Sequence, residues 1–229
     1  MKNKIIFSKQ DPRKMVENKG TKKFNFLNLY GLYQFKKSPL FKKSISFKHA
    51  INFPDGKPIA KKIKTKQQRG PHFTKDFLMS VHAKNKKHFF IGLNPKDKIK
   101  LSKITKISQK NIKSYNPPFI KEEQFSEEEQ KKIINKINKE KVNYLWVCIG
   151  NPKQEILSYQ IFEKIKVDKI FNVGAAIDFL LKKQKEAPKF FIKIGAESAY
   201  IGIMNPRRAL KKVFKSFYAL RYLGNIKVE

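Results

Sequence analysis

The sequence is poor in cysteine. Cys148 is the only one among 229 residues, so the chain cannot close a disulfide within itself. A fold held together without disulfides is typical of a reducing compartment. The four histidines show no spacing typical of metal ligands, and no pair of cysteines exists to join them. The composition therefore predicts neither a disulfide framework nor a metal site.

Long apolar runs are also missing. No stretch reaches the roughly 18 apolar residues that a membrane-spanning helix needs. Near the N-terminus only Ile5-Ile6-Phe7 is continuously apolar, which is too short for the core of a signal peptide. We therefore expect a cytoplasmic protein without a transmembrane helix.

Acidic residues are scarce. The chain has 18 Asp and Glu against 52 Lys and Arg, for a formal net charge of +34. Residues 1–120 carry 30 basic and 5 acidic side chains, and residues 121–229 carry 22 and 13. Such an excess attracts nucleic acid, acidic lipid or phosphate-rich ligands. A general compositional preference for Lys, Ile and Asn explains the charge equally well.

What is present is an alternation of strand and helix patterns. Residues 143–149 and 169–173 are apolar on both faces, as in strands buried inside a parallel sheet. Ser126 followed by three glutamates predicts the start of a helix that runs to about Lys139. Further candidates are strands at 24–29, 87–93 and 107–114 and a helix at 73–84.

This order predicts an α/β fold, Rossmann-like, with a mostly parallel sheet and flanking helices. Ligands of such sheets bind beyond the carboxyl ends of the strands. We therefore expect the loops after the strands to meet at a site. These loops follow Leu27, Phe53, Leu93, Ile149 and Val173.

The segment Gly150-Asn151-Pro152-Lys153-Gln154-Glu155 links a strand to a helix. Gly permits a close backbone approach, and the free N–H groups of a helix start favour an anion such as a diphosphate. Lys153 adds charge, and Gln154 can hydrogen-bond a sugar or a phosphate. A tight turn with solvated polar residues is the plainer interpretation.

Asp178 follows the next strand, within Val173-Gly174-Ala175-Ala176-Ile177-Asp178-Phe179. A carboxylate among apolar neighbours must be paired or face a ligand. It could accept hydrogen bonds from sugar hydroxyls, or it could cap a helix or be satisfied within the core.

These motifs, with others in the same order, make the chain similar to the WecG/TagA/CpsF glycosyltransferase family over about residues 24–225. The G-x-P-K-Q-E block and the downstream V-G with D-F are the most specific. The weaker matches are Asn28 at a strand end, Asp55-Gly56, Arg69-Gly70, Asn116-Pro117-Pro118-Phe119, Ala187-Pro188, Gly195-Ala196-Glu197 and Pro206-Arg207-Arg208.

The resemblance implies inverting transfer of an N-acetylhexosamine, such as ManNAc, from a UDP-sugar to a polyprenyl-diphosphate-linked sugar. A base must take the proton of the acceptor hydroxyl, and Asp55 is the candidate, although it also fits a plain Asp-Gly turn. The leaving diphosphate needs cations or N–H donors. Arg69 and Lys153 can supply them.

The donor sugar needs orienting polar groups, for which Asn28, Gln154 and Asp178 fit. No D-x-D motif occurs, which argues against a carboxylate-clamped metal ion, and the family is regarded as metal-independent. We therefore expect no cofactor.

The C-terminal segment is patterned as an amphipathic helix. From Asn205 to Leu223, apolar residues recur at helical spacing, and most cations lie off that stripe. It could pack on its own domain or rest on anionic lipid. The resemblance favours the membrane and implies that arginines of this segment reach the active site. The local candidates are Arg207, Arg208 and Arg221.

The expected organisation is a basic segment (1–23), an α/β glycosyltransferase domain (24–194) and a membrane-associating appendage (195–229). We expect peripheral attachment at the inner face of the plasma membrane, and oligomers are possible. The chain departs from the family pattern at Phe26, Asn143, Glu186, Ser198 and Ile201. An inactive member with a role in assembly is therefore an alternative, motivated by Phe26, Glu186 and Ile201. A basic nucleic-acid-binding protein is a further alternative, but no RNA- or DNA-binding motif is present.

Overall fold

The computed structural model describes residues 4–184 and 213–228. The strands are β1 (Ile5–Phe7), β2 (Lys22–Leu27), β3 (Ala50–Pro54), β4 (His88–Ile91), β5 (Ile112–Tyr115), β6 (Tyr144–Val147), β7 (Lys169–Asn172) and β8 (Ile226–Val228). The α-helices are α1 (Pro12–Met15), α2 (Leu29–Lys37), α3 (Pro39–Ile45), α4 (Lys57–Lys62), α5 (Gly70–Met79), α6 (Val81–Lys84), α7 (Lys98–Thr105), α8 (Glu127–Glu140), α9 (Lys153–Gln160) and α10 (Ala176–Leu180). The 3₁₀ helices are η1 (Pro95–Asp97), η2 (Gln109–Asn111), η3 (Phe162–Lys164) and η4 (Ala219–Asn225).

Six strands form one sheet in the order β3-β2-β7-β6-β4-β5, and every neighbouring pair is parallel. All residues of β4, β6 and β7 are buried, because helices cover both faces of the sheet. The prediction of an α/β fold with a parallel sheet and flanking helices is confirmed.

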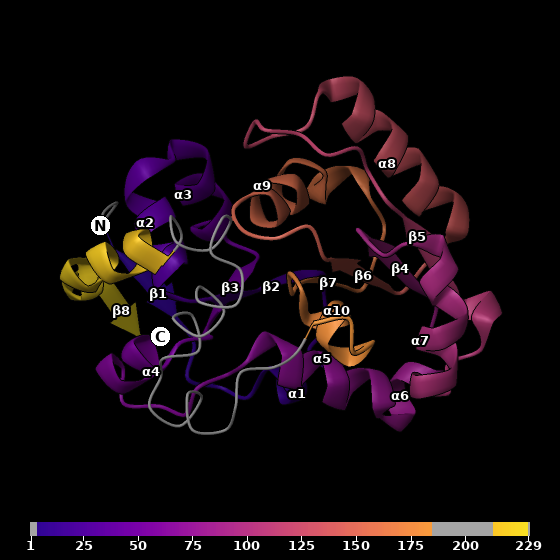
Figure 1. The fold of residues 1–229 in the computed structure, drawn as a ribbon, viewed down its shortest axis with the longest axis horizontal. Coiled ribbons are helices and arrows are strands. Elements are labelled where there is room, and N and C mark those ends of the chain that lie inside the picture. Colours follow the sequence, from indigo (N-terminus) through magenta and orange to yellow (C-terminus); the bar gives the residue numbers. More distant parts are fainter. Residues whose placement is uncertain (1–3, 185–212, 229) are drawn as a thin grey trace.

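Alternate residues of the central strands β4, β6 and β7 belong to two separate cores. On one face, Leu145 and Ile170 pack with Ile133 and Ile137 of α8 and with Leu157 of α9. On the other face, strand aromatics pack against α5, α7 and α10 in a cluster rich in rings. It includes Phe24, Phe73, Phe77, Trp146, Phe171 and Ile177. Figure 1 shows α8 and α9 on one side of the sheet and α5 and α10 on the other.

A third cluster joins the two ends of the chain. β1 and β8 pair in parallel, with Ile5 opposite Ile226. Ile5 and Phe7 are buried together with residues of α2, α3 and α4, and Ala219 of η4 belongs to the same cluster. Figure 1 shows the yellow C-terminal segment beside α2 and β1. The first and last described strands therefore stabilise each other.

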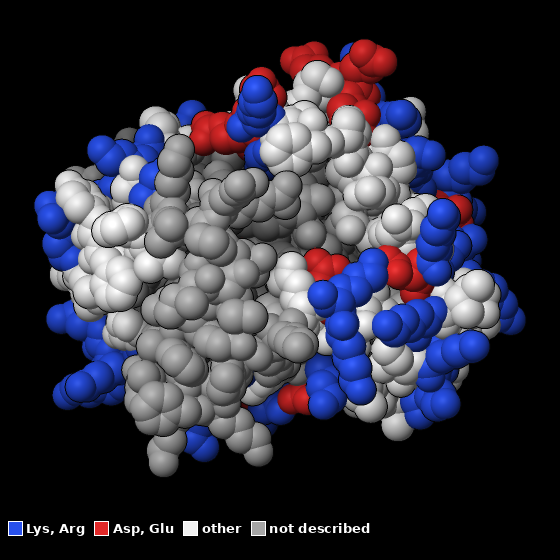
Figure 2. Space-filling model, viewed as in Figure 1, with Lys and Arg blue, Asp and Glu red and all other residues white. Residues whose placement is uncertain are grey.

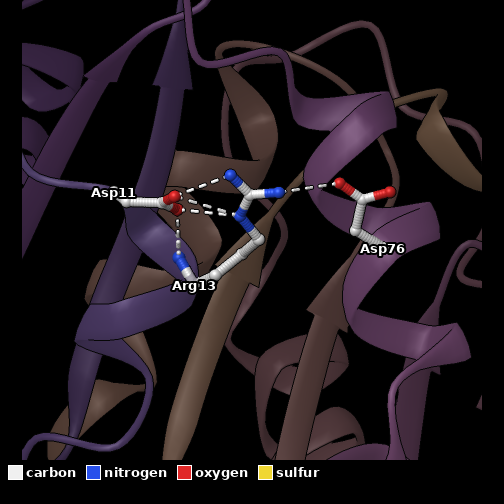
Figure 3. A network of polar contacts seen from close by, with 3 residues as sticks. All are labelled: Asp11, Arg13 and Asp76. Carbon is white, nitrogen blue, oxygen red and sulfur yellow. Dashed lines mark hydrogen bonds and ion pairs between the residues drawn. The ribbon is translucent and has the colours of Figure 1, made fainter.

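A polar network holds α1 against α5 (Figure 3). Asp11 caps α1 by accepting a hydrogen bond from the backbone N–H of Arg13, and the guanidinium of Arg13 pairs with the same carboxylate. The other side of the guanidinium contacts Asp76 on α5, at 3.1 Å. The hydrogen bond from Arg13 lowers the pKa of Asp11. These groups are largely exposed, so they fix the position of α1 more than they stabilise the fold.

Candidate functional site

The loops that follow β4 and β6 open a cleft at the carboxyl edge of the sheet. β4 leads to α7 on one face and β6 leads to α9 on the other, so the two loops diverge, as they do at ligand sites of open α/β sheets. Gly92 (φ +92°) and Gly150 (φ +85°) turn the chain there. A Cβ on Gly92 would lie 3.1 Å from the carbonyl oxygen of Cys148, so this close approach requires glycine.

The cleft has a volume of about 690 Å³, which is within the range of small-molecule sites. Its walls come from the loops after β4, β5 and β6 and from the first two turns of α2. The lining includes Tyr30, Gln34, Gly92, Asn116–Glu123, Phe125 and Cys148–Lys153.

Phe119 and Lys153 meet at this cleft. The ring of Phe119 is 89% exposed, and the Lys153 ammonium lies 5.0 Å from its centroid. The same ammonium also donates a hydrogen bond to the carbonyl oxygen of Ile120. Lys153 is the first residue of α9, so its charge adds to the positive end of the helix dipole. An exposed ring, a cation and the start of a helix thus meet at one space.

Gln154 connects two loops of the site. Its Oε1 accepts a hydrogen bond from the backbone N–H of Gly174 (2.8 Å), and its Nε2 donates to Oε1 of Glu155 (2.9 Å). The side chain is buried, with 3% of its surface exposed. Gln154 therefore ties the start of α9 to the loop after β7, and both ends of its carboxamide have partners within the protein.

Asp178 lies in the first turn of α10 and is half-buried. Burial raises the pKa of its carboxyl, Lys183 lowers it, and Asp97 raises it again. Lys183 forms an ion pair with Asp97, which ends the short 3₁₀ helix η1 before α7. Charged groups before α7 and after α10 thus influence Asp178.

Asn28, Asp55 and Arg69 form a second group, at the ends of β2 and β3. The Asp55 backbone N–H donates to the Leu27 carbonyl (2.9 Å), and its Oδ1 accepts from the backbone N–H of Gly70 (3.1 Å). A Cβ on Gly56 would lie 3.6 Å from the Cβ of Asn28, so the turn after β3 lies beside the start of α2. This geometry fixes Asp55 between the end of β2 and the start of α5.

The side chains of Asn28 and Arg69 also have local roles. Asn28 is exposed and caps α2 by accepting from the backbone N–H groups of Tyr30 and Gly31. Arg69 is 7% exposed, and its Nη1 lies 2.6 Å from Nε2 of His72. The Asn28 Oδ1 is occupied in this arrangement, so its amide group is the part suited to a ligand.

The two groups share one edge of the sheet. β2 lies directly beside β7, so Asn28 and Asp178 follow neighbouring strands, whereas β3, before Asp55, and β6, before Gln154, are three positions apart. At the usual spacing of neighbouring strands, the ends of β3 and β6 are separated by about 14 Å. One hydrogen bond joins Asp55 to Gly70, next to Arg69, and another joins Gln154 to the loop of Asp178. Each group is thus held together by a hydrogen bond of its own.

Of the three arginines predicted in the tail, only Arg221 lies within the described residues. It belongs to η4, and its guanidinium stacks on Tyr218 at 3.6 Å from the ring centroid. Tyr218 contacts Tyr33, which stacks on Tyr30 at the cleft. Arg207 and Arg208 lie outside the described residues.

Four residues of this region were not among the predicted site residues. Tyr30, Gln34 and Phe119 line the cleft, and Glu155 supports Gln154. The motif Asn116-Pro117-Pro118-Phe119, an aromatic residue in a turn after an expected strand, is the signal that could have found Phe119. Nothing in the sequence marks Tyr30 and Gln34, because α2 brings them to the cleft from a separate part of the sheet.

Charge on the visible face is uneven. Figure 2 shows Lys and Arg over much of the coloured surface, whereas Asp and Glu gather where α8 begins. The first turn of that helix is Glu127, Glu128 and Glu129. The cleft is also lined by Lys121, Glu122 and Glu123, so it has both positive and negative charges. In the described ranges, no helix combines the length and the apolar character needed to cross a bilayer.

An open parallel sheet with helices on both faces and a cleft beyond its strand ends defines a doubly wound α/β protein. Within that class, the chain belongs to the WecG/TagA/CpsF family of glycosyl transferases, whose family model matches residues 10–227. The match spans nearly the whole chain and confirms the resemblance seen in the motifs. Among curated proteins, no match was found.

Proposed function

We propose that the protein transfers an N-acetylhexosamine, such as ManNAc, from a UDP-sugar to a polyprenyl-diphosphate-linked sugar in the synthesis of a cell-surface polysaccharide. Membership of a glycosyltransferase family supports a sugar donor and an acceptor. The main support for a nucleotide-linked donor is the cleft between the loops after β4, β5 and β6, where Phe119, Lys153 and the start of α9 meet.

The cleft suits a nucleoside diphosphate. An exposed aromatic ring can stack on a base, and Phe119 offers such a ring. The diphosphate would then lie against Lys153 and the N–H groups at the start of α9, which favour negative charge. As the sugar–phosphate bond breaks, these donors stabilise the charge that develops on the leaving UDP.

Asp55 is the proposed base. The acceptor hydroxyl attacks the anomeric carbon, a C–O bond forms there, and the bond to the UDP oxygen breaks. The hydroxyl proton passes to the Asp55 carboxylate, one oxygen of which is held by the N–H of Gly70. Attack from the face opposite UDP inverts the anomeric centre. Asn28, Gln154 and Asp178 would orient the donor sugar, and Arg69 would contribute positive charge near the leaving group.

We further propose that the protein works at the inner face of the plasma membrane. Phe214, Phe217 and Leu220 are exposed, whereas Ala219 on the same segment is buried in the third cluster. Lys215 and Arg221 lie among these apolar side chains and stack on Tyr33 and Tyr218. Apolar and aromatic side chains next to cations are typical of segments that rest on anionic lipid.

One observation favours a member that retains the fold without activity. Phe26 stands where the family often has Thr, and it packs in the core, with its ring centroid 5.0 Å from that of Phe73 and 5.4 Å from that of Phe53. The position therefore offers no hydroxyl to a ligand.

A screen of UDP-sugars against a polyprenyl-diphosphate-sugar analogue tests both candidates. We expect transfer from one UDP-N-acetylhexosamine, with inversion, and the same rate in EDTA because cationic side chains serve the diphosphate. Binding of UDP without transfer to any acceptor would support the inactive candidate. Activity that disappears in EDTA and returns with Mn²⁺ would contradict the cationic mechanism.

A further inference from the structure

A lysine and a glutamate are fully buried beneath the contact between Gln154 and Gly174. Lys23 of β2 and Glu155 of α9 both have 0% exposed surface. The Lys23 ammonium donates to the backbone carbonyl oxygens of Ser44 (2.7 Å) and Glu155 (2.9 Å). The Glu155 carboxyl accepts from Gln154 through Oε1, and its Oε2 is buried without a hydrogen-bond partner.

Such a pair is expensive to bury. Burial lowers the pKa of Lys23 and raises the pKa of Glu155, and each group counters part of the shift of the other. The Lys23 ammonium contacts the backbone of Glu155 and acts on its carboxyl by charge. Well-packed apolar residues of similar size are often as stable as buried charged groups, or more so. Stability alone therefore does not explain why Lys23 and Glu155 occupy these positions. Because they lie directly beside the site, we look for a role in its function.

The geometry gives that role to the Gln154 carboxamide. If the carboxamide were flipped, its NH₂ group would face the Gly174 N–H, and two donors would oppose each other. The Glu155 carboxyl accepts from Nε2 and so favours the same orientation from the other side. Lys23 holds the backbone of Glu155 in the first turn of α9 and supplies the charge opposite its carboxyl.

We propose that Glu155 and Lys23 are positioning residues for donor binding. They lock Gln154 in the orientation that joins the start of α9 to the loop of Gly174 and Asp178. This inference rests on the proposed function, because the donor is taken to lie against that junction. When Lys23 and Glu155 are replaced, Gln154 has no acceptor for its Nε2. The start of α9 and the loop after β7 are then no longer held in a fixed relative position.

The test separates stability from binding. The variants are Glu155→Met, Lys23→Met and the double variant, and the measurements are thermal unfolding and UDP affinity by calorimetry. Each single variant leaves one unpaired buried charge and should unfold at a lower temperature. The double variant removes both charges and should regain part of the unfolding temperature, because the carbonyl oxygens of Ser44 and Glu155 still lack a donor. It should nevertheless bind UDP at least tenfold more weakly than the wild type. Recovery of UDP affinity together with stability would overturn the proposal.

Lys169→Met is the matched control. Lys169 is also a buried lysine of the sheet, and its ammonium donates to the carbonyl oxygens of Asn18 and Gly20, at the start of the strands. This variant should unfold at a lower temperature without any change in UDP affinity. A comparable loss of UDP affinity would mean that any buried lysine of the sheet has the same effect, which would overturn a specific role for Lys23.

A second measurement does not depend on the proposed function. The side-chain amide protons of Gln154, identified by their disappearance in Gln154→Met, should exchange slowly with solvent in the wild type. Exchange should be at least tenfold faster in the double variant. Unchanged exchange would refute the positioning role even in a protein that binds UDP. If the wild type binds no UDP or UDP-sugar, the proposed function fails, and the exchange rates still decide the role of the pair.

Discussion

The substitution Asp55→Asn removes a proton acceptor and keeps one hydrogen bond. The carbonyl oxygen of the new carboxamide can still accept from the Gly70 N–H, so the loop between β3 and α5 should keep its shape. We expect kcat to fall about 10²–10⁴-fold, the usual loss when a general base is removed, with donor affinity almost unchanged. Steady-state kinetics and UDP-sugar binding measure the two quantities. A kcat within a few-fold of the wild type would remove Asp55 from the mechanism.

His88 has a purely structural role that pH can reveal. Its Nδ1 accepts from the indole N–H of Trp146 (3.1 Å), so its Nε2 donates to the Ala83 carbonyl (2.8 Å) and the ring is neutral. Burial lowers the pKa of His88 to about 4, against the raising effect of the bond to Ala83. The unfolded chain takes up a proton near pH 6.5, so stability is complete above that pH and falls as the pH drops toward 4.

The loss should be on the order of 3 kcal/mol in the free energy of unfolding. Urea unfolding of the wild type and of His88→Gln between pH 7.5 and pH 4.5 measures it. Carboxyl groups titrate in both proteins, so the difference between the two curves isolates His88. Parallel curves would show that His88 takes up its proton at the same pH in the folded and unfolded protein, so that burial does not lower its pKa.

At the scale of single elements, the loop after β5 carries the prediction for the nucleotide. Phe119→Ala should weaken UDP binding about 5- to 150-fold, because a stack between a base and a ring contributes about 1–3 kcal/mol. Phe214→Ala is the matched control, since it removes a similarly accessible ring (72% exposed) from the helical turn before η4, away from the cleft. Calorimetry gives both affinities. If Phe119→Ala binds UDP as the wild type does, the base lies elsewhere.

The strands that could be predicted are those whose burial on both faces leaves an unbroken apolar pattern. β6 and β7 are of this kind, and the structure has them within two residues of the expected bounds. The helix expected over 73–84 is instead two helices, because Ser80 adopts an extended conformation and ends α5. A single serine carries no signal strong enough to predict that break.

The candidate site shows the same limit. Loop positions follow from strand order, so the edge of the sheet that carries Asp55 and Gln154 was predictable. The sequence could not predict which side-chain atoms remain for a ligand. The side-chain oxygens of Gln154 and Asn28 already accept hydrogen bonds, from the N–H of Gly174 and from the start of α2. Their roles toward a substrate stay predictions.

At the scale of the whole molecule, the pairing of β1 with β8 was beyond the sequence pattern. Each strand has three residues, and the partners lie at opposite ends of the chain, with Ile5 opposite Ile226. The pairing matters for experiments on the tail. A truncation before Gly195 would remove β8 from β1 and Ala219 from the third cluster, so it would disturb the fold as well as membrane contact.

Surface substitutions are therefore the sharper test of membrane binding. We expect a variant with serine at Phe214, Phe217 and Leu220 to keep its unfolding temperature, because these side chains are 72%, 59% and 41% exposed. It should lose the part of anionic-vesicle binding that persists at high salt, since that part comes from apolar burial in the lipid. Sedimentation with vesicles at low and high salt measures both parts.

The remaining cations should preserve binding at low salt, because each contributes on the order of 1 kcal/mol near an anionic surface. Met79 and Val81, changed together to serine, provide the control: they are exposed apolar residues (47% and 75%) around the junction of α5 and α6. That variant should bind vesicles as the wild type does. If both variants lose vesicle binding equally, any exposed apolar surface of the protein supports binding, and the C-terminal segment has no specific role in it. If the wild type ignores vesicles but binds DNA with a steep dependence on salt, its net charge of +34 serves nucleic acid and the membrane proposal is wrong.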